Sequence, residues 1–168
     1  VVNRMIEWKL NSNFIKKLIS HALPRLENFS DFIPLSGFLF EEHPNLEFSS
    51  LVGKTEPIEA SKLIKICEWE LEKTSPWERE NICEVFKKMA EKEDLKLKNM
   101  LPLFFQVISG QSVSLPLFDA MEILGQDLVR IRLRKALELL STEGAGLSKK
   151  GLKALEKEYM AKYGDRID

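Results

Sequence analysis

The stretch from Lys98 to Leu140 constrains the fold more than any other part of the chain, because two glycines divide it into three helical patterns. The first pattern repeats apolar residues at intervals of three and four and stops at Gly110. The second begins near Pro116, whose missing N–H costs least in the first turn of a helix, and stops at Gly125. The third begins at Gln126. These signals predict three consecutive helices joined by tight breaks.

Helical spacing also dominates the rest of the chain, and no alternation of strands with helices favours a nucleotide-binding parallel sheet. The remaining patterns predict helices over residues 14–22, 30–40, 59–74, 75–92 and 147–163. The polar segment 41–56, broken by Pro44 and Gly53, is typical of a linker. We therefore predict an all-α chain with two small helical bundle subdomains. The proximal bundle covers residues 1–54, the distal bundle covers residues 55–145, and a helical extension covers residues 146–168.

Three polar side chains are predicted to cap these helices. Asn13 and Ser30 each precede an apolar run, as N-cap residues do. Ser75 opens the sequence Ser75-Pro76-Trp77-Glu78, which has the spacing of a capping box with proline at the first helical position. The aromatic residues between positions 32 and 40 could stack on nucleic-acid bases, but their helical spacing favours packing in the core.

The composition supports a small helical protein that works in a reducing compartment. A chain of 168 residues that is 44% hydrophobic can bury one good core or two small ones. No window approaches the roughly 18 apolar residues of a membrane span, so we expect no membrane partner. The N-terminus is not a signal peptide and does not begin with Met, which suggests a fragment or a processed chain. Cys67 and Cys83 lack metal-ligand spacing, so we expect inert thiols, no metal and a cytoplasmic location.

Charge is distributed unevenly along the chain. The net charge of −1 argues against a generic polyanion binder. From Gly125 onward, however, ten lysines and arginines stand against seven acids. The polar side of the third helix carries Arg130, Arg132 and Arg134, which we expect to contact phosphates. An ordinary solvated helix face is the alternative interpretation of the same residues.

No constellation of residues predicts catalysis by this chain. His21 and His43 have no serine or cysteine partner in a recognisable nucleophile motif. The glycines are explained by helix ends and a linker, and none forms a phosphate-binding loop. We therefore expect neither an active site nor a cofactor in this chain.

Two sets of motifs resemble the C-terminal anticodon-binding region of bacterial glutamyl-tRNA synthetases, which belong to the class I aminoacyl-tRNA synthetases. The distal set comprises Pro102-Leu103, Val107-Ile108-Ser109-Gly110, Ser114-Leu115-Pro116-Leu117-Phe118, Glu122-Ile123-Leu124-Gly125 and Arg130-Ile131-Arg132. The proximal set comprises Pro24-Arg25-Leu26, Phe29 and Phe32. The resemblance covers roughly residues 13–140 and is most specific in its last third.

The resemblance implies a parent enzyme that uses ATP to attach glutamate to tRNA-Glu. The ATP-site motif His-x-Gly-His of the family is absent from this chain, so the chain by itself should be inactive. Its expected partner is the anticodon loop of tRNA-Glu, not DNA, and the family leads us to expect a monomer. The resemblance does not say whether the parent also charges tRNA-Gln.

The resemblance also assigns roles to five residues. Arg25 takes the position that reads the first anticodon base, and a guanidinium fork suits the acceptor edge of a base or a phosphate. Ser114 and Leu117, with Leu115 between them, take positions that contact the other bases. Phe105 stands where the family usually has an arginine, and stacking on a base could replace that charge.

Each assignment has an ordinary structural alternative. Arg25 could pair with Glu27 or a backbone carbonyl, Ser114 could be a plain N-cap, and Phe105 could belong to the core. At the level of the whole chain, the alternatives are the helical tail of a class I lysyl-tRNA synthetase and a helical protein-interaction module.

Overall fold

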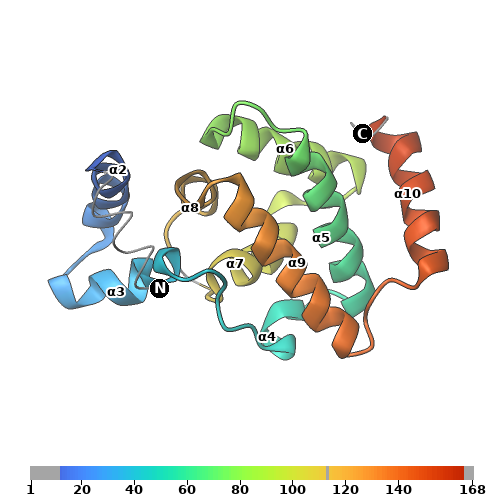
Figure 1. The fold of residues 1–168 in the computed structure, drawn as a ribbon, viewed down its shortest axis with the longest axis horizontal. Coiled ribbons are helices and arrows are strands. Elements are labelled where there is room, and N and C mark those ends of the chain that lie inside the picture. The colour runs from blue at the N-terminus through green and yellow to red at the C-terminus, as the bar shows by residue number, and fades with distance from the viewer. Residues whose placement is uncertain (1–11, 113, 165–168) are drawn as a thin grey trace.

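The computed structural model describes residues 12–112 and 114–164, and within these ranges every regular element is a helix (Figure 1). The predicted all-α class is therefore confirmed. In chain order the elements are α2 (Ser12–Ala22), η1 (Leu23–Arg25), η2 (Phe29–Asp31), α3 (Phe32–Ser36), η3 (Gly37–Phe40), α4 (Phe48–Val52), α5 (Pro57–Glu72), α6 (Arg79–Lys92), α7 (Leu97–Ser109), α8 (Leu117–Leu124), α9 (Gln126–Thr142) and α10 (Lys149–Tyr163).

The three helices predicted between Lys98 and Leu140 are present, and the first two end where the glycines stand. Gly110 follows α7 in the left-handed region, with φ of 68°. A Cβ atom added to Gly110 would lie 2.8 Å from Cβ of Pro44, so only glycine fits this close turn. Pro116 comes directly before α8, and Gly125 separates α8 from α9. The predicted helix breaks are therefore confirmed.

The predicted caps at the other helices are wrong. Asn13 lies inside α2. Residues 29–40 form two 3₁₀ turns around the short α3, and Asn28 with Asp31 makes the capping box there in place of Ser30.

The predicted capping box at Ser75 is also wrong, because α6 begins only at Arg79 and no side chain caps it. The indole Nε1 of Trp77 donates to the carbonyl of Met121 in α8, at 3.0 Å. This long-range contact holds Trp77 against α8 and outside α6, which local sequence spacing does not reveal.

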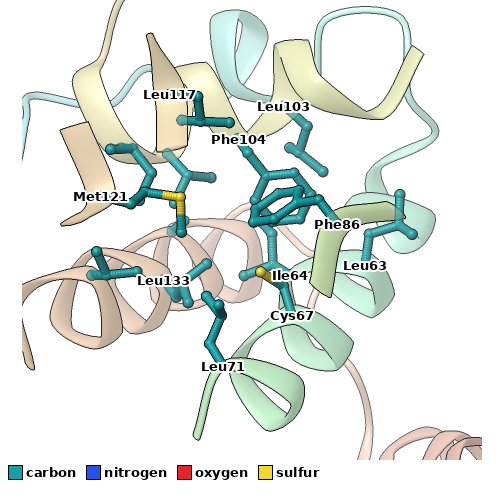
Figure 2. Packing of buried hydrophobic residues seen from close by; sticks show 14 of the residues in the cluster. Leu63, Ile64, Cys67, Leu71, Phe86, Leu103, Phe104, Leu117, Met121 and Leu133 are labelled. Atoms are coloured by element: carbon teal, nitrogen blue, oxygen red, sulfur yellow. The ribbon is translucent and has the colours of Figure 1, made fainter. Parts of the chain in front are cut away.

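The core lies between α5, α6, α7, α8 and α9, and Figure 2 shows the side chains that these helices contribute. Phe86 packs edge-on against Phe104, with 4.8 Å between the ring centroids. Cys67 is fully buried, and this burial, together with the charges of Glu68 and Glu70, raises the pKa of its thiol. That pKa agrees with the expected inert thiol, whereas Cys83 is only half-buried.

The two ends of the fold are built by different parts of the chain. Helices α2 and α3 lie at one end, and α10 lies at the other (Figure 1). Buried residues from α2, η3 and α10 belong to the same hydrophobic cluster as the central helices. The three-part division at residues 54 and 145 stays a prediction.

Candidate nucleic-acid interface

Helix α2 packs against α8, and two side-chain pairs show that the helices run in opposite directions. Nζ of Lys17 lies 2.8 Å from Oε1 of Glu122, near the C-terminal end of α8. One turn further along α2, Nδ1 of His21 lies 3.7 Å from Oδ1 of Asp119, near the N-terminal end of α8. The chain that continues beyond His21 therefore extends towards the end of α8 at which the segment 110–116 enters it.

Arg25 lies one turn beyond His21, at this same end. Its side chain is exposed, and its Nη1 donates to the backbone carbonyl of His21, at 3.3 Å. The carbonyl alternative considered from the sequence is therefore present. A guanidinium carries five N–H donors, so this bond leaves others that can face a ligand.

The loop between α7 and α8 is tied to α3, so it lies beside the segment that carries Arg25. Nε2 of Gln111 donates to the carbonyl of Pro34, at 3.1 Å. Ser114 is half-buried, and its hydroxyl donates to the carbonyl of Leu115, at 3.1 Å. Pro116 is the N-cap of α8 and no side chain caps that helix, so the N-cap alternative for Ser114 is wrong. The lone pairs of the Ser114 hydroxyl can still accept hydrogen bonds.

The side chains of Leu115 and Leu117 do not lie where the resemblance places them. Leu115 is 0% exposed and Leu117 is 4% exposed. Figure 2 shows Leu117 among the packed core side chains, with Phe104 and Met121. The predicted apolar contact with a base is therefore corrected: both leucines anchor the loop to the core, because apolar side chains on either side of Pro116 gain more from burial.

Phe105 is half-buried and lines a largely apolar groove of about 1040 Å³. The groove runs between α7 and the α4–α5 connection, and Leu95 and Pro102 also line it. Lys54 and Lys98 lie along it and form no ion pair with any residue in the described ranges. Where the family usually has an arginine, this chain therefore places an aromatic ring at the edge of an apolar groove with two lysines.

Arg132 is not on the surface, which corrects its predicted phosphate contact. Its side chain is 0% exposed. It donates to the carbonyls of Phe38 at 2.7 Å, Glu41 at 2.6 Å and Glu42 at 3.2 Å, and also to the carbonyl of Ile108. The guanidinium thus fastens the segment after η3 to the C-terminal end of α7 and has a structural role.

The other basic residues of α9 are exposed but lie beside acids. Nη2 of Arg130 is 3.0 Å from Oδ1 of Asp127, and Nε of Arg134 is 2.6 Å from Oε1 of Glu68. Burial alone would raise the pKa of Glu68, but hydrogen bonds from Lys65 and Arg134 outweigh burial and lower it. These acids neutralise much of the charge on α9, so the phosphate contacts of Arg130 and Arg134 stay predictions that must displace existing ion pairs.

One exposed aromatic residue at the Arg25 end was named from the sequence as part of the proximal motif but not as a base contact. Phe29, in η2, is 93% exposed, and Ile33 of α3 is 64% exposed. The aromatic residues of this region were expected to pack in the core, and Phe38 does so at 3% exposure. Phe29 differs because it sits in a 3₁₀ turn outside the helical repeat. An exposed ring near a guanidinium is a suitable surface for stacking an unpaired base.

Among residues 12–112 and 114–164, no helix combines the length and apolar character needed to cross a bilayer. No group of three or more His, Cys, Asp or Glu side chains there is arranged to hold a metal ion.

Comparison with known families identifies the class of protein. The family model described as "Anticodon binding domain" matches residues 1–137. This match covers well over half of the chain, so the chain belongs to the anticodon-binding domain family.

The individual relatives are glutamate–tRNA ligases. The chain is 41% identical over 152 residues to the enzyme of Pseudomonas paraeruginosa, a match that covers 90% of this chain and 30% of that protein. It is 39% identical over 155 residues to the enzyme of Pseudomonas putida strain GB-1, covering 92% and 31%. The chain thus spans less than a third of the length of the curated relatives it matches.

A solved structure supports the fold. The crystal structure of a glutamate tRNA ligase from Elizabethkingia meningosepticum superimposes with a TM-score of 0.67 at 21% identity, over 77% of this chain and 25% of that one. Together with the relatives, this match confirms the resemblance to the anticodon-binding region of glutamyl-tRNA synthetases.

Proposed function

We propose that this chain recognises the anticodon loop of tRNA-Glu and belongs to a parent glutamate–tRNA ligase. The observation that carries the proposal is the antiparallel packing of α2 on α8. Through Lys17–Glu122 and His21–Asp119, this packing brings the Arg25 segment to the same end of the fold as the loop 110–116. An anticodon reader needs several base-contacting groups on one surface, and this end offers them.

Each candidate group suits an unstacked base in a different way. Arg25 supplies a rigid fork of donors for the acceptor edge of the first base or for a neighbouring phosphate. Phe29 supplies an exposed aromatic face for stacking. Ser114 supplies a hydroxyl that can accept from a base edge. The groove beside Phe105 supplies apolar walls, with Lys54 and Lys98 placed to meet a phosphate.

The chemistry of aminoacylation is assigned to the rest of the parent protein. The proposal places ATP and glutamate there, and it gives this chain no catalytic residue, no metal and no cofactor. The chain alone is proposed to bind tRNA as a monomer in the cytoplasm without charging it. Its contribution is to select the correct tRNA by its anticodon, which is a difference in binding free energy between matched and mismatched loops.

Binding of an anticodon stem-loop tests the proposal. We expect the chain to bind the tRNA-Glu stem-loop more tightly than an unrelated stem-loop, in a salt-dependent manner. Arg25→Ala should weaken the matched complex by about 1–3 kcal/mol, the scale of a good bidentate base contact. Lys92→Ala is the matched control, because Lys92 is an exposed cation at the end of α6, away from the Arg25 segment.

Two results would count against the proposal. Equal affinity for matched and unrelated stem-loops would favour the protein-interaction alternative. If Arg25→Ala and Lys92→Ala weaken binding equally, the effect is one of net charge, and Arg25 does not read a base.

A further inference from the structure

Helix α10 lies beyond the region that the family model matches, and its inner face is firmly held by the core. The hydroxyl of Tyr159, which is 1% exposed, donates to Oε1 of Glu70 at 2.5 Å. Its ring packs against Trp69, with 4.8 Å between the centroids. One turn later, the hydroxyl of Tyr163 donates to Oε1 of Glu93, at 2.9 Å. Helix α5 and Glu93, the C-cap residue of α6, therefore fix which side of α10 faces inward.

The connection into α10 is fixed as well. The hydroxyl of Ser61 in α5 donates to the carbonyl of Ala145, at 2.7 Å. A Cβ atom on Gly146 would lie 2.8 Å from the backbone Cα of Ser141, so the chain turns there at close range. Ser148 then caps α10 by accepting from the backbone N–H of Gly151, at 3.0 Å. The start of the helix is thus as well defined as its docked end.

The outward side of α10 carries four exposed lysines, which we call the lysine face: Lys149, Lys150, Lys153 and Lys157. At about 100° per residue these positions fall within a sector of roughly 100° on the helix. Of the two acids of α10, Glu158 lies on another side of the helix, and Glu156 lies at the edge of this sector, about 20° from Lys149. Lys149, Lys153 and Lys157 follow one another at intervals of about 6 Å along the axis.

The lysine face differs from the basic side of α9 and from Lys162. Within the described ranges, none of its four lysines forms an ion pair. The remaining lysine of α10, Lys162, lies outside this face and pairs with Glu158 at 2.9 Å and Glu93 at 3.0 Å. On α9, Arg130 and Lys135 are likewise paired with acids. The lysine face therefore keeps a concentrated positive charge on a chain whose net charge is −1.

The placement of these lysines also works against the helix itself. Lys149 and Lys150 are the first two residues of α10, where the positive end of the helix dipole disfavours cations. Helix stability would favour acids there. A cluster that opposes the helix dipole and forms no ion pair with described residues is suited to a ligand outside the chain that carries regularly spaced negative charges.

We propose that the lysine face binds the phosphate backbone of RNA without reading its bases. Lysine ammonium groups are point charges that suit phosphate oxygens, and neutralising phosphates releases counterions whatever the sequence. Because α10 lies at the opposite end of the fold from α2 (Figure 1), this contact is separate from anticodon reading. It gives the chain a second contact with RNA, one that does not depend on the base sequence.

Salt-dependent binding of oligouridylate, a single strand without structure or a glutamate anticodon, tests this proposal. The double variant Lys149→Gln/Lys153→Gln should lower the slope of log K against log salt by about 1.4, at about 0.7 per lost contact with a single strand. The matched control is Lys87→Gln/Lys135→Gln, which also removes two exposed lysines, but lysines that Glu84 and Glu138 already neutralise. We expect the control to retain most of the slope.

Two results would overturn the proposal. One is an equal change of slope in both double variants, which would reduce the effect to net charge. The other is displacement of oligouridylate by polyglutamate at equal charge, which would show an acidic-protein site. Anticodon discrimination by the same two double variants is read in parallel and should be unchanged. If the proposed function is wrong, the chain will not distinguish the matched from the unrelated stem-loop. If the lysine face does not bind phosphates, the slope of log K against log salt will not fall in Lys149→Gln/Lys153→Gln.

Discussion

Replacing Arg132 by methionine tests a buried guanidinium that donates only to backbone carbonyls in the hydrogen bonds described above. The guanidinium donates to four backbone carbonyls, those of Phe38, Glu41, Glu42 and Ile108. Methionine fills a similar apolar volume but donates nothing. The carbonyl of Phe38 keeps a second donor, the backbone N–H of Glu41 at 3.3 Å. The substitution therefore removes the donor from the other three carbonyls.

The expected loss of stability follows from these three carbonyls. A buried polar group left without a partner costs about 1–3 kcal/mol. Because Glu41 and Glu42 are exposed residues, water can reach their carbonyls, and the lower part of that range applies to them. We expect a total loss on the order of 3–5 kcal/mol, which is a large part of the roughly 5–15 kcal/mol that stabilises a domain.

Urea denaturation followed by circular dichroism measures this loss. With a slope of about 1–3 kcal/mol per molar urea, the midpoint of Arg132→Met should fall by roughly 2 M. Arg130→Met is the matched control: it removes an exposed arginine from the same helix and should cost less than about 1 kcal/mol. Equal midpoints for the two variants would refute the buried clamp. If Arg132→Met is as stable as the unsubstituted chain but its RNA binding depends less on salt, Arg132 contacts phosphate, as expected from the sequence.

Two further predictions concern pH and backbone conformation. Burial would raise the pKa of Glu70, but hydrogen bonds from Lys88 and Tyr159 outweigh it and lower this pKa. Its contribution to stability is therefore present above about pH 4.3, its unfolded pKa, and is lost as the pH falls through the lower folded value. As the pH falls through this range, the urea midpoint should decline less in Glu70→Gln than in the unsubstituted chain. Gly110→Ala should cost more than Gly144→Ala, by about 1–2 kcal/mol in urea denaturation. Both glycines have positive φ, but only at Gly110 does a Cβ meet a neighbour, and equal costs would contradict the close contact with Pro44.

The helices of the distal region could be predicted because their ends are encoded locally. Gly110 and Gly125 terminate helices, and Pro116 immediately precedes the first residue of α8. These residues end or begin a helix through their own backbone conformation, so the few residues around them are enough to predict the helix end. Trp77 shows the opposite case, since its indole bonds to a residue 44 positions away and keeps the segment around Pro76 out of the following helix.

For the site residues too, some features follow from local sequence and others depend on distant parts of the chain. Arg132 stands four residues after Leu128 and four before Ala136, both of which are buried, so the helical period already placed it on the inner face of α9. Applying that period would have separated it from the outward Arg130 and Arg134. Its carbonyl partners at residues 38–42 lie about 90 positions away, and no local pattern predicts them.

The Arg25 end illustrates what the sequence does supply and what it does not. The motif around Pro24 identified Arg25, and the structure places that side chain on the surface. Arg25 and the 110–116 loop lie at one end of the fold because α2 packs antiparallel on α8. Two side-chain pairs between residues about 100 positions apart define this packing. The extension was predicted as a helix, but its docking through Tyr159 was not, because Glu70 lies 89 positions earlier.

We propose that the anticodon is read where the end of α2 meets the start of α8. Titration of the ¹⁵N-labelled chain with the tRNA-Glu anticodon stem-loop, followed by amide chemical shifts, tests this location. We expect saturable shifts at residues 21–33 and 110–117, with little change on the inner face of α10. Saturable shifts confined to other surfaces, or the same shifts with an unrelated stem-loop, would contradict it.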